Sequence, residues 1–171
     1  MTSQRISAII PTRNASAQIG LLLDALLAQT TPLHEIILID SGSTDQTTEI
    51  ASSYPKTRII PIDPKDFDHG GTRDRAIRES TGDLLWLLTQ DALPIKNDCL
   101  QNLIAPFADE TVACVCGRQI APDTCSREEQ LTRAFNYPAR SFTRSAADIP
   151  NLGVKAFFLS NTNSVYRRTA Y

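Results

Sequence analysis

The sequence predicts an α/β fold with a mostly parallel, Rossmann-like sheet that carries helices on both faces. Short aliphatic runs and helical segments alternate four times within the first 95 residues. Such alternation specifies parallel strands joined by crossover helices. The runs are almost wholly apolar, as in strands buried on both faces, and each is followed by polar residues at its carboxyl end.

The first strand and helix are read from residues 6–27. Residues 6–10 form a short apolar run that Pro11 ends, which fits a buried strand. The apolar residues of 19–27 recur at the spacing of one helix face, so we expect an amphipathic helix there, capped by Asn14 or Ser16.

The second and third strands lie at residues 35–40 and 58–62. Between them, Ser43 precedes Gln46 by three residues, the spacing of a capping box. We therefore expect a helix that opens at Ser43 and runs to about Ser53.

The remaining elements follow with a weaker pattern towards the carboxyl end. We expect a helix at 72–80, a buried strand at 83–89, a helix at 98–107, a strand at 112–118 and one helix near 128–135 within a long polar loop. Residues 155–171 have a strand pattern that reaches the end of the chain without a stop signal, so we expect the chain to be a fragment.

Composition limits the possible functions. The chain has 171 residues, 42% of them hydrophobic, and a net charge of −2. This suits one packed domain and argues against a nucleic-acid binder, since there is no excess of Lys and Arg to neutralise phosphates. Four cysteines match no zinc spacing, and no apolar stretch approaches the ~20 residues of a membrane span. We expect a soluble, cytoplasmic domain.

Polar residues gather where the strands end. The four strand ends carry residues 11–14, 40–43, 66–73 and 89–91. Ligands of open α/β sheets bind outside these ends, and neither G-x-G-x-x-G nor G-x-x-x-x-G-K-[ST] occurs. We therefore expect a site for a nucleotide diphosphate held partly by a cation near Asp91.

These motifs resemble a known family. I-I-P-T-R-N at 9–14, I-D-S-G-S-T-D at 39–45 and T-Q-D at 89–91 resemble family 2 glycosyltransferases of the GT-A fold. F-D-H-G-G-T-R at 67–73, L-L-T-Q-D-A at 87–92, G-R-Q at 117–119 and F-F-L-S-N-T-N-S-V-Y-R-R at 157–168 resemble their bacterial rhamnosyltransferase branch. The resemblance implies transfer of rhamnose from dTDP-rhamnose to a surface polysaccharide or lipid-linked glycan.

The resemblance also implies roles for single residues. Thr12, Arg13 and Asn14 are expected to line the nucleotide pocket, Asp40 to contact the base and Asp91 to bind the metal. The nucleotide-sugar-binding residues that we expect are Pro11, Thr12, Arg13, Asn14, Asp40, Ser41, Gly42, His69, Gly70, Gly71, Thr72, Arg73, Gln90 and Asp91.

The chain departs from the family pattern at two positions. Thr89 stands where the first acid of the family's D-x-D signature belongs, so Mg²⁺ or Mn²⁺ would be held mainly by phosphates and water. Ser41 replaces the family's second acid after Asp40. Metal dependence is therefore an open question at this stage.

The stretch K-D-F-D-H-G-G-T-R at 65–73 has two interpretations. Asp66, Asp68 and His69 could form a metal cluster, whereas Gly70 to Arg73 could present free helix N–H groups and a cation to a phosphate or sugar. The family's metal signature follows the fourth strand rather than the third. We therefore favour a donor-side loop at 69–73, with an ordinary capped turn as the alternative.

The resemblance divides the chain into a donor-binding half, about residues 1–95, and the start of an acceptor-side half, about 96–171, within one domain. Asn161, Asn163 and Ser164 could face the acceptor or form an ordinary turn. Inverting enzymes of this fold use a carboxylate as general base, and the family places it beyond the position of Tyr171. We therefore assign no catalytic residue, expect little transfer by this chain alone, and expect any peripheral membrane contact in the missing C-terminal region.

Two other functions stay open. A noncatalytic nucleotide-binding module could keep this fold and lack the base. A nucleotidyltransferase shares the α/β half, but its glycine-rich loop after the first strand has no counterpart in P-T-R-N-A-S-A.

Overall fold

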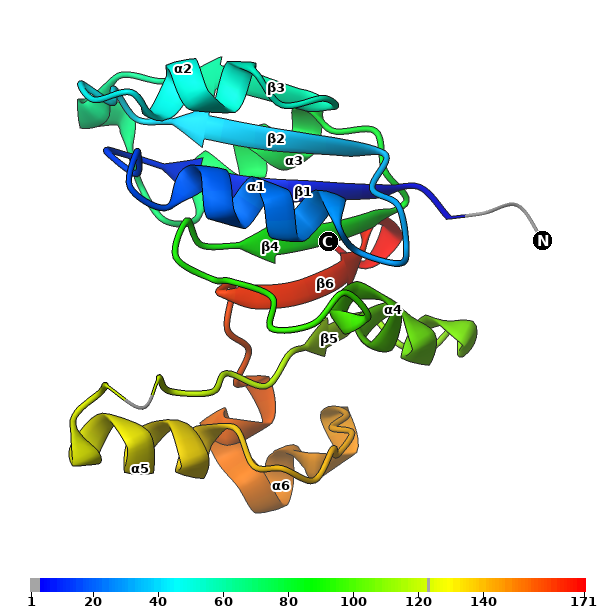
Figure 1. The fold of residues 1–171 in the computed structure, drawn as a ribbon. Helices are drawn as coiled ribbons and strands as arrows, with labels where there is room; N and C mark the ends of the chain where they lie inside the picture. The colour runs from blue at the N-terminus through cyan, green and yellow to red at the C-terminus, as the bar shows by residue number, and fades with distance from the viewer. Residues whose placement is uncertain (1–3, 123) are drawn as a thin grey trace.

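The computed structural model describes residues 4–122 and 124–171 and is built around a six-stranded sheet in the order β3-β2-β1-β4-β6-β5 (Figure 1). The strands are β1 (Ile6–Thr12), β2 (Glu35–Asp40), β3 (Thr57–Pro61), β4 (Leu84–Leu88), β5 (Cys114–Cys116) and β6 (Asn163–Arg167). β1 to β4 are mutually parallel, and β6 is antiparallel to β4 and β5. The predicted α/β class with a mostly parallel sheet is confirmed.

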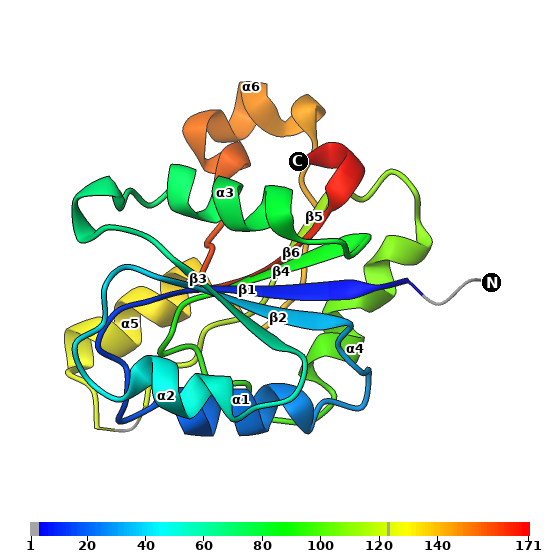
Figure 2. The same cartoon turned by 90° about the horizontal axis from the view of Figure 1, so that it is seen from above.

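Helices cover both faces of this sheet, as predicted (Figure 2). The helices are α1 (Ile19–Leu27), α2 (Thr47–Ser52), α3 (Gly71–Glu79), α4 (Cys99–Ile104), α5 (Arg127–Asn136) and α6 (Ile149–Leu152). Side chains of α1, α2 and α4 pack on one face, and those of α3 pack on the other. Successive strand residues point to opposite faces, so Ile10 enters the first cluster and Ile9 the second.

The predicted range of α1 is confirmed, but its predicted cap and the predicted start of α2 are wrong. α1 begins at Ile19 after Gln18, and no side chain caps it. Asn14 instead accepts a hydrogen bond from the Thr44 amide. α2 begins at Thr47 rather than Ser43. The Ser43 hydroxyl oxygen accepts from the Asn14 amide at 2.9 Å, and its proton goes to Asp40 Oδ1, so it caps no helix.

The carboxyl-terminal strands are shorter than predicted. β6 spans Asn163–Arg167, and 3₁₀ turns at Gly153–Phe157 and Arg168–Ala170 occupy the rest of the predicted strand. β6 pairs with the five residues of β4, and β5 pairs with only three residues of β6. Sheet partners therefore set these strand lengths, and the apolar pattern of residues 154–159 does not.

Residues 118–160 leave the sheet and return to it. This excursion contains α5, α6 and short 3₁₀ turns, and it lies apart from the sheet below β5 and β6 in Figure 1. α5 agrees with the helix predicted near 128–135, while α6 was not predicted. Among the residues described, no helix is both long and apolar enough to cross a bilayer.

Candidate functional site

The candidate site lies along the sheet edge where the parallel strands end. Thr12, the last residue of β1, is in register with Asp40, the last residue of β2. β4 lies on the other side of β1, and its end leads into Thr89, Gln90 and Asp91. The topology therefore brings three of the predicted polar segments to one edge, which is the ligand-binding edge of open α/β sheets.

Asp40 is the centre of a buried polar cluster at this edge. It is 4% exposed and accepts hydrogen bonds from Thr12 Oγ1 at 3.2 Å, Ser43 N at 2.9 Å and Ser43 Oγ at 2.5 Å. Ser41 is also buried, and its hydroxyl donates to the Thr12 carbonyl at 3.2 Å. Gly42 has a φ of 73°, which suits glycine in this turn. These bonds fix the turn after β2, and a base contact by Asp40 stays a prediction.

Gln90 and Asn14 hold the loop after β1. Gln90 Oε1 accepts from Arg13 N at 2.8 Å, and Gln90 Nε2 donates to Arg13 O at 3.3 Å. Asn14 lies at a φ of 48°, donates its amide to Ser43 Oγ and accepts from the Thr44 amide. The polar groups of Gln90 and Asn14 are thus used to position backbone. Arg13 is left exposed at the edge with its guanidinium in solvent.

Asp45 has a structural role beside the candidate site. The Thr47 hydroxyl, together with the Ser16 and Thr47 amides, holds the pKa of the Asp45 carboxyl well below its usual range. The carboxylate accepts from Ser16 N at 3.0 Å and from Thr47 N at 3.0 Å. It therefore joins the loop after β1 to the start of α2.

The N-terminus of α3 is already capped. Asp68 Oδ1 accepts from Gly70 N at 2.9 Å and from Gly71 N at 2.6 Å, and the Asp68 amide donates to Thr72 Oγ1 at 3.2 Å. The expectation that these N–H groups are free is therefore wrong, since the Asp68 carboxylate occupies them. An anion bound at Gly70 and Gly71 would first have to displace Asp68.

Arg73 is buried, contrary to the exposed cation that its first-turn position suggested. It is 7% exposed, and its Nη1 donates to the His69 carbonyl at 2.7 Å. Burial lowers the pKa of its guanidinium, and its Nε has no hydrogen-bond partner within residues 4–122 and 124–171. Arg73 is therefore a buried support of the loop that contains His69. The His69 side chain is exposed, and its ring makes an edge contact with the Phe67 ring.

The predicted metal position offers a single carboxylate. Asp91 is exposed, and Thr89 Oγ1 is buried with no hydrogen-bond partner in the part of the chain that the structure describes. Across these residues, no three His, Cys, Asp or Glu side chains gather in a way that could hold a metal ion. One carboxylate fits a cation such as Mg²⁺, which takes its remaining ligands from phosphates and water.

The three residues expected on the acceptor side have different environments. Asn163 Oδ1 accepts from Trp86 Nε1 at 2.8 Å, and Ser164 is fully buried in β6. Asn161 is exposed, and its Oδ1 accepts from Tyr166 Oη at 2.8 Å. Asn163 and Ser164 thus belong to the sheet, and Asn161 is the one that faces solvent. Trp86 is fully buried.

Arg167 and Arg168 do not lie at the candidate site. Because β6 is antiparallel to β4, its last residues lie at the opposite edge of the sheet. Arg167 Nη2 donates to the Phe107 and Asp109 carbonyls, and Arg168 donates to the Ile77 and Gly82 carbonyls. Both side chains thus connect backbone segments of the chain to one another.

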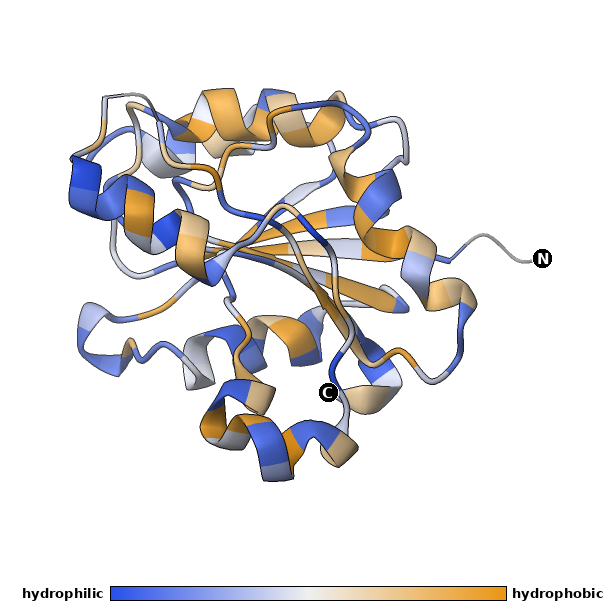
Figure 3. Ribbon diagram, turned by 90° about the horizontal axis from the view of Figure 1, so that it is seen from below, coloured by the Kyte–Doolittle hydropathy of each residue, from blue (hydrophilic) through white to orange (hydrophobic). Residues whose placement is uncertain are grey.

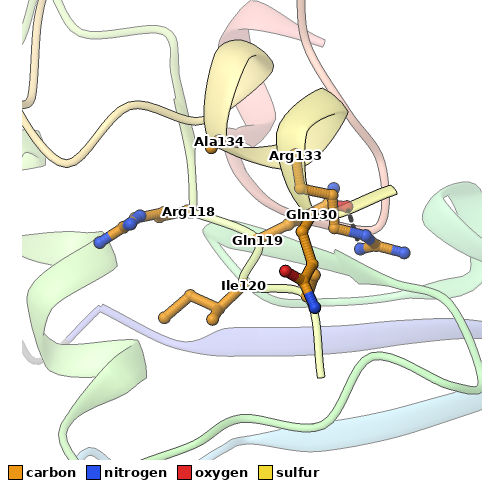
Figure 4. Close-up of a pocket in the computed structure, with 7 residues that line it drawn as sticks. Arg118, Gln119, Ile120, Gln130, Arg133 and Ala134 are labelled. Carbon is orange, nitrogen blue, oxygen red and sulfur yellow. Dashed lines mark hydrogen bonds between the residues drawn. The ribbon is translucent and has the colours of Figure 1, made fainter. Parts of the chain in front are cut away.

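The sequence missed an open cavity of about 190 Å³, lined by polar and apolar side chains, beside the loop after β5 (Figure 4). β5 is parallel to β4, since both are antiparallel to β6, so this loop begins at the same edge as the candidate site. Gln119 donates to Tyr137 Oη and Ser160 Oγ at 2.8 Å each and accepts from Arg133 Nη1 at 3.1 Å. Arg118 lines the cavity and is exposed. The G-R-Q sequence directly after a strand is the signal that could have indicated this cavity.

Comparison with known proteins decides the family. The family model described as glycosyl transferase family 2 matches residues 7–171. This chain belongs to glycosyltransferase family 2. Among curated relatives, it is 41% identical over 168 residues to the O-antigen chain rhamnosyltransferase RfbN of Salmonella typhimurium and 39% identical over 165 residues to WbaN of Salmonella anatum. The alignments cover 98% and 95% of the chain but 54% and 52% of those proteins, so the family 2 chain spans about half their length.

Solved structures show the GT-A fold of this family 2 chain. The mannosyltransferase PcManGT of Pyrobaculum calidifontis, in complex with GDP-Man and Mn²⁺, superposes with a TM-score of 0.67 at 22% identity, covering 97% of this chain and 45% of that one. Staphylococcus aureus TarS 1–349 gives a TM-score of 0.69 at 22% identity, covering 96% and 47%. The predicted GT-A fold is therefore confirmed.

Proposed function

We propose that this chain is the donor-binding part of an inverting family 2 glycosyltransferase. In the proposed reaction a sugar passes from a nucleotide-sugar donor to a surface polysaccharide or lipid-linked glycan. The observation that supports this most strongly is the 41% identity to a rhamnosyltransferase across 98% of the chain, combined with a polar edge at the ends of β1, β2 and β4.

Rhamnose carried by dTDP is the proposed donor. Its support is the likeness to the two O-antigen chain rhamnosyltransferases, together with the F-D-H-G-G-T-R and L-L-T-Q-D-A motifs. The side chains at the sheet edge support only the broader class of nucleotide diphosphate sugars, since they offer the Arg13 guanidinium and the Asp91 carboxylate.

In this proposal, Arg13 contacts the diphosphate. Its backbone is clamped by Gln90, and its guanidinium is exposed at the edge. A guanidinium is a strong partner for phosphate oxygens. Asp40, Ser41 and Gly42 shape the nucleotide side of the pocket through their buried turn, and His69 forms its outer wall on the loop that Arg73 supports.

Asp91 is the proposed ligand of Mg²⁺ or Mn²⁺. A divalent cation at the diphosphate neutralises the charge that develops on the leaving group. Asp91 supplies the protein's carboxylate. Thr89 lies two residues before it, and its Oγ1, buried and without a partner among the described residues, is a further oxygen. PcManGT, a protein of the same fold, is recorded with Mn²⁺.

The proposed division of the chain gives donor binding to about residues 1–95 and the start of the acceptor side to about 96–171. Asn161 and the cavity lined by Arg118 and Gln130 are the proposed acceptor-side groups. The transfer needs a carboxylate base, and the proposal assigns that role to no residue of this chain. Its proposed location is the cytoplasmic face of the cell membrane, where a lipid-linked acceptor is accessible.

A thermal-shift screen of dTDP-, UDP- and GDP-sugars, with and without Mg²⁺ or Mn²⁺, tests the proposal. We expect dTDP-rhamnose to raise the melting temperature most, and Arg13→Gln and Asp91→Asn to remove most of the shift. Arg78→Gln is the matched control, because Arg78 lies exposed on α3 and pairs with Asp74. An equal response to all three nucleotides removes the rhamnose assignment, and no response to any of them contradicts donor binding.

The same screen leaves one alternative, a noncatalytic nucleotide-binding module. A chain of the relatives' length separates the two functions. Binding of dTDP-rhamnose by such a chain without transfer or hydrolysis would favour the module over the enzyme.

A further inference from the structure

The excursion between β5 and β6 exposes large apolar side chains. Phe135 is 78% exposed, Phe142 57%, Val154 87% and Phe157 68%. Single exposed apolar residues are ordinary, but contiguous ones mark an interaction surface. Figure 3 shows apolar and hydrophilic residues side by side on the helical turns of this excursion, away from the sheet.

Basic side chains connect these apolar residues into one surface. Lys155 Nζ lies 6.0 Å from the centre of the Phe135 ring, and Arg144 Cζ lies 4.5 Å from the centre of the Phe142 ring. Arg144 Nη1 also donates to the Lys155 carbonyl. Arg140 and Phe142 border a common hollow on the same segment. We call Phe135, Arg140, Phe142, Arg144, Lys155 and Phe157 the aromatic-basic surface.

The charge of this segment is opposite to that of the rest of the chain. Arg133 pairs with Glu129, and residues 134–159 contain three Arg or Lys and one Asp, a net charge of +2 in a chain of net charge −2. The one acid, Asp148, accepts hydrogen bonds from the Ser145 amide and hydroxyl in a capping box. Its carboxylate caps a 3₁₀ turn, and Arg140, Arg144 and Lys155 outnumber it beside the phenyl rings.

We infer that the aromatic-basic surface docks the protein on an anionic lipid membrane. Phenyl rings enter the boundary between headgroups and acyl chains, and neighbouring Lys and Arg stay at the level of the phosphates. The positive segment complements the negative charge of such a membrane. A protein partner fits less well, because Lys is depleted at the centres of protein interfaces and Lys155 Nζ lies beside the Phe135 ring.

This inference extends the membrane location proposed above and moves the contact into residues 135–157. Its test uses no sugar donor. Membrane docking can therefore fail while donor binding succeeds, and donor binding can fail while membrane docking succeeds. The probe is sedimentation of the 171-residue chain with sucrose-loaded vesicles of phosphatidylcholine alone or with 30% phosphatidylglycerol.

We expect binding to the anionic vesicles, weaker binding to the zwitterionic ones, and a decrease as salt is raised. The variant R140Q/R144Q/K155Q should lower the partition coefficient on the order of 100-fold, since each basic residue near the surface contributes roughly fivefold. The variant F142S/F157S should lower it roughly tenfold through lost apolar burial, without a change of charge.

The matched control is K65Q/R78Q/K96Q, which removes the same charge from exposed residues elsewhere. It should retain the binding of the parent chain, and thermal melts should show that every variant is folded. Equal losses in the two triple variants, or no binding to anionic vesicles, would overturn the inference. Concentration-dependent self-association that F142S/F157S abolishes would also overturn it. So would loss of vesicle binding in a chain extended to the relatives' length, because protein would then cover the surface.

Discussion

Gly117 is a position where one added methyl group should be costly. An added Cβ would lie 2.2 Å from Asn163 Nδ2 and 2.9 Å from Asn163 Cγ. Asn163 cannot move without breaking its 2.8 Å hydrogen bond with the indole N–H of the fully buried Trp86. Gly117→Ala therefore combines overpacking, about 1–3 kcal/mol, with an unsatisfied buried donor, about 1–3 kcal/mol. Since the two effects share one displacement, we expect a total loss of about 2–4 kcal/mol.

Urea denaturation followed by circular dichroism measures this loss. Gly20→Ala is the matched control, because its Cβ would meet Tyr54 Oη at 3.4 Å, in ordinary contact, within helix α1. It should be neutral or stabilising by up to about 1 kcal/mol.

A double-mutant cycle checks the cause. In an Asn163→Ala background the methyl group has room, so Gly117→Ala should cost at least about 1 kcal/mol less than in the parent chain. If Gly117→Ala is within about 0.5 kcal/mol of the parent, or if the two losses add fully, the contact between Gly117 and Asn163 does not carry the effect.

Three further predictions concern the cap, an acid and a thiol. Asp68→Ala should lower the free energy of unfolding by about 1 kcal/mol through loss of the α3 cap. Asp66→Ala should change it by less than about 0.5 kcal/mol. Urea denaturation measures both changes. Burial raises the pKa of Glu35, but hydrogen bonds led by the Thr81 amide outweigh it, and the folded pKa lies below 4.5. The stabilisation by the ionised Glu35 is therefore present above pH 4.5 and lost as pH falls through the folded pKa. Glu35→Gln should reduce the loss of unfolding free energy that urea melts record between pH 6 and pH 3. An unchanged loss in this variant contradicts the role given to Glu35. Burial raises the pKa of Cys114 to about 12, so iodoacetamide at pH 8 should leave Cys114 unmodified in peptide mass spectra until urea is added.

The sequence predicted the strands well because burial on both faces leaves a local signal. β2 and β4 consist almost entirely of aliphatic residues and lie at the positions expected from that run alone. The length of β6 has no such signal. It depends on pairing with β4, whose residues lie nearly 80 positions earlier in the chain.

The place of the candidate site was also predictable, because topology alone brings the ends of parallel strands together. Which of its polar groups are free was not. Gln90 bonds to Arg13 across 77 residues, and Asn14 bonds to Thr44 across 30. Asp68 has local partners, yet its carboxylate sits on the two amides that the glycine pair seemed to offer. Tertiary hydrogen bonds decide such assignments, and no local pattern encodes them.

The cavity beside β5 was missed for the same reason. Gln119 joins the loop after β5 to Tyr137 and Ser160, which lie 18 and 41 residues away. The side chains around Gln119 come together only when α5 packs against that loop, so no local sequence pattern indicates the cavity.

The central claim is that a nucleotide sugar binds at the edge formed by β1, β2 and β4. Titration of dTDP-rhamnose with Mg²⁺ into the ¹⁵N-labelled chain, followed by amide chemical shifts, tests it most directly. We predict saturable shifts that cluster at residues 12–14, 40–43, 69–73 and 89–91, and that weaken in Arg13→Gln. Shifts confined to residues 118–134, or no saturable shift at all, would contradict the claim.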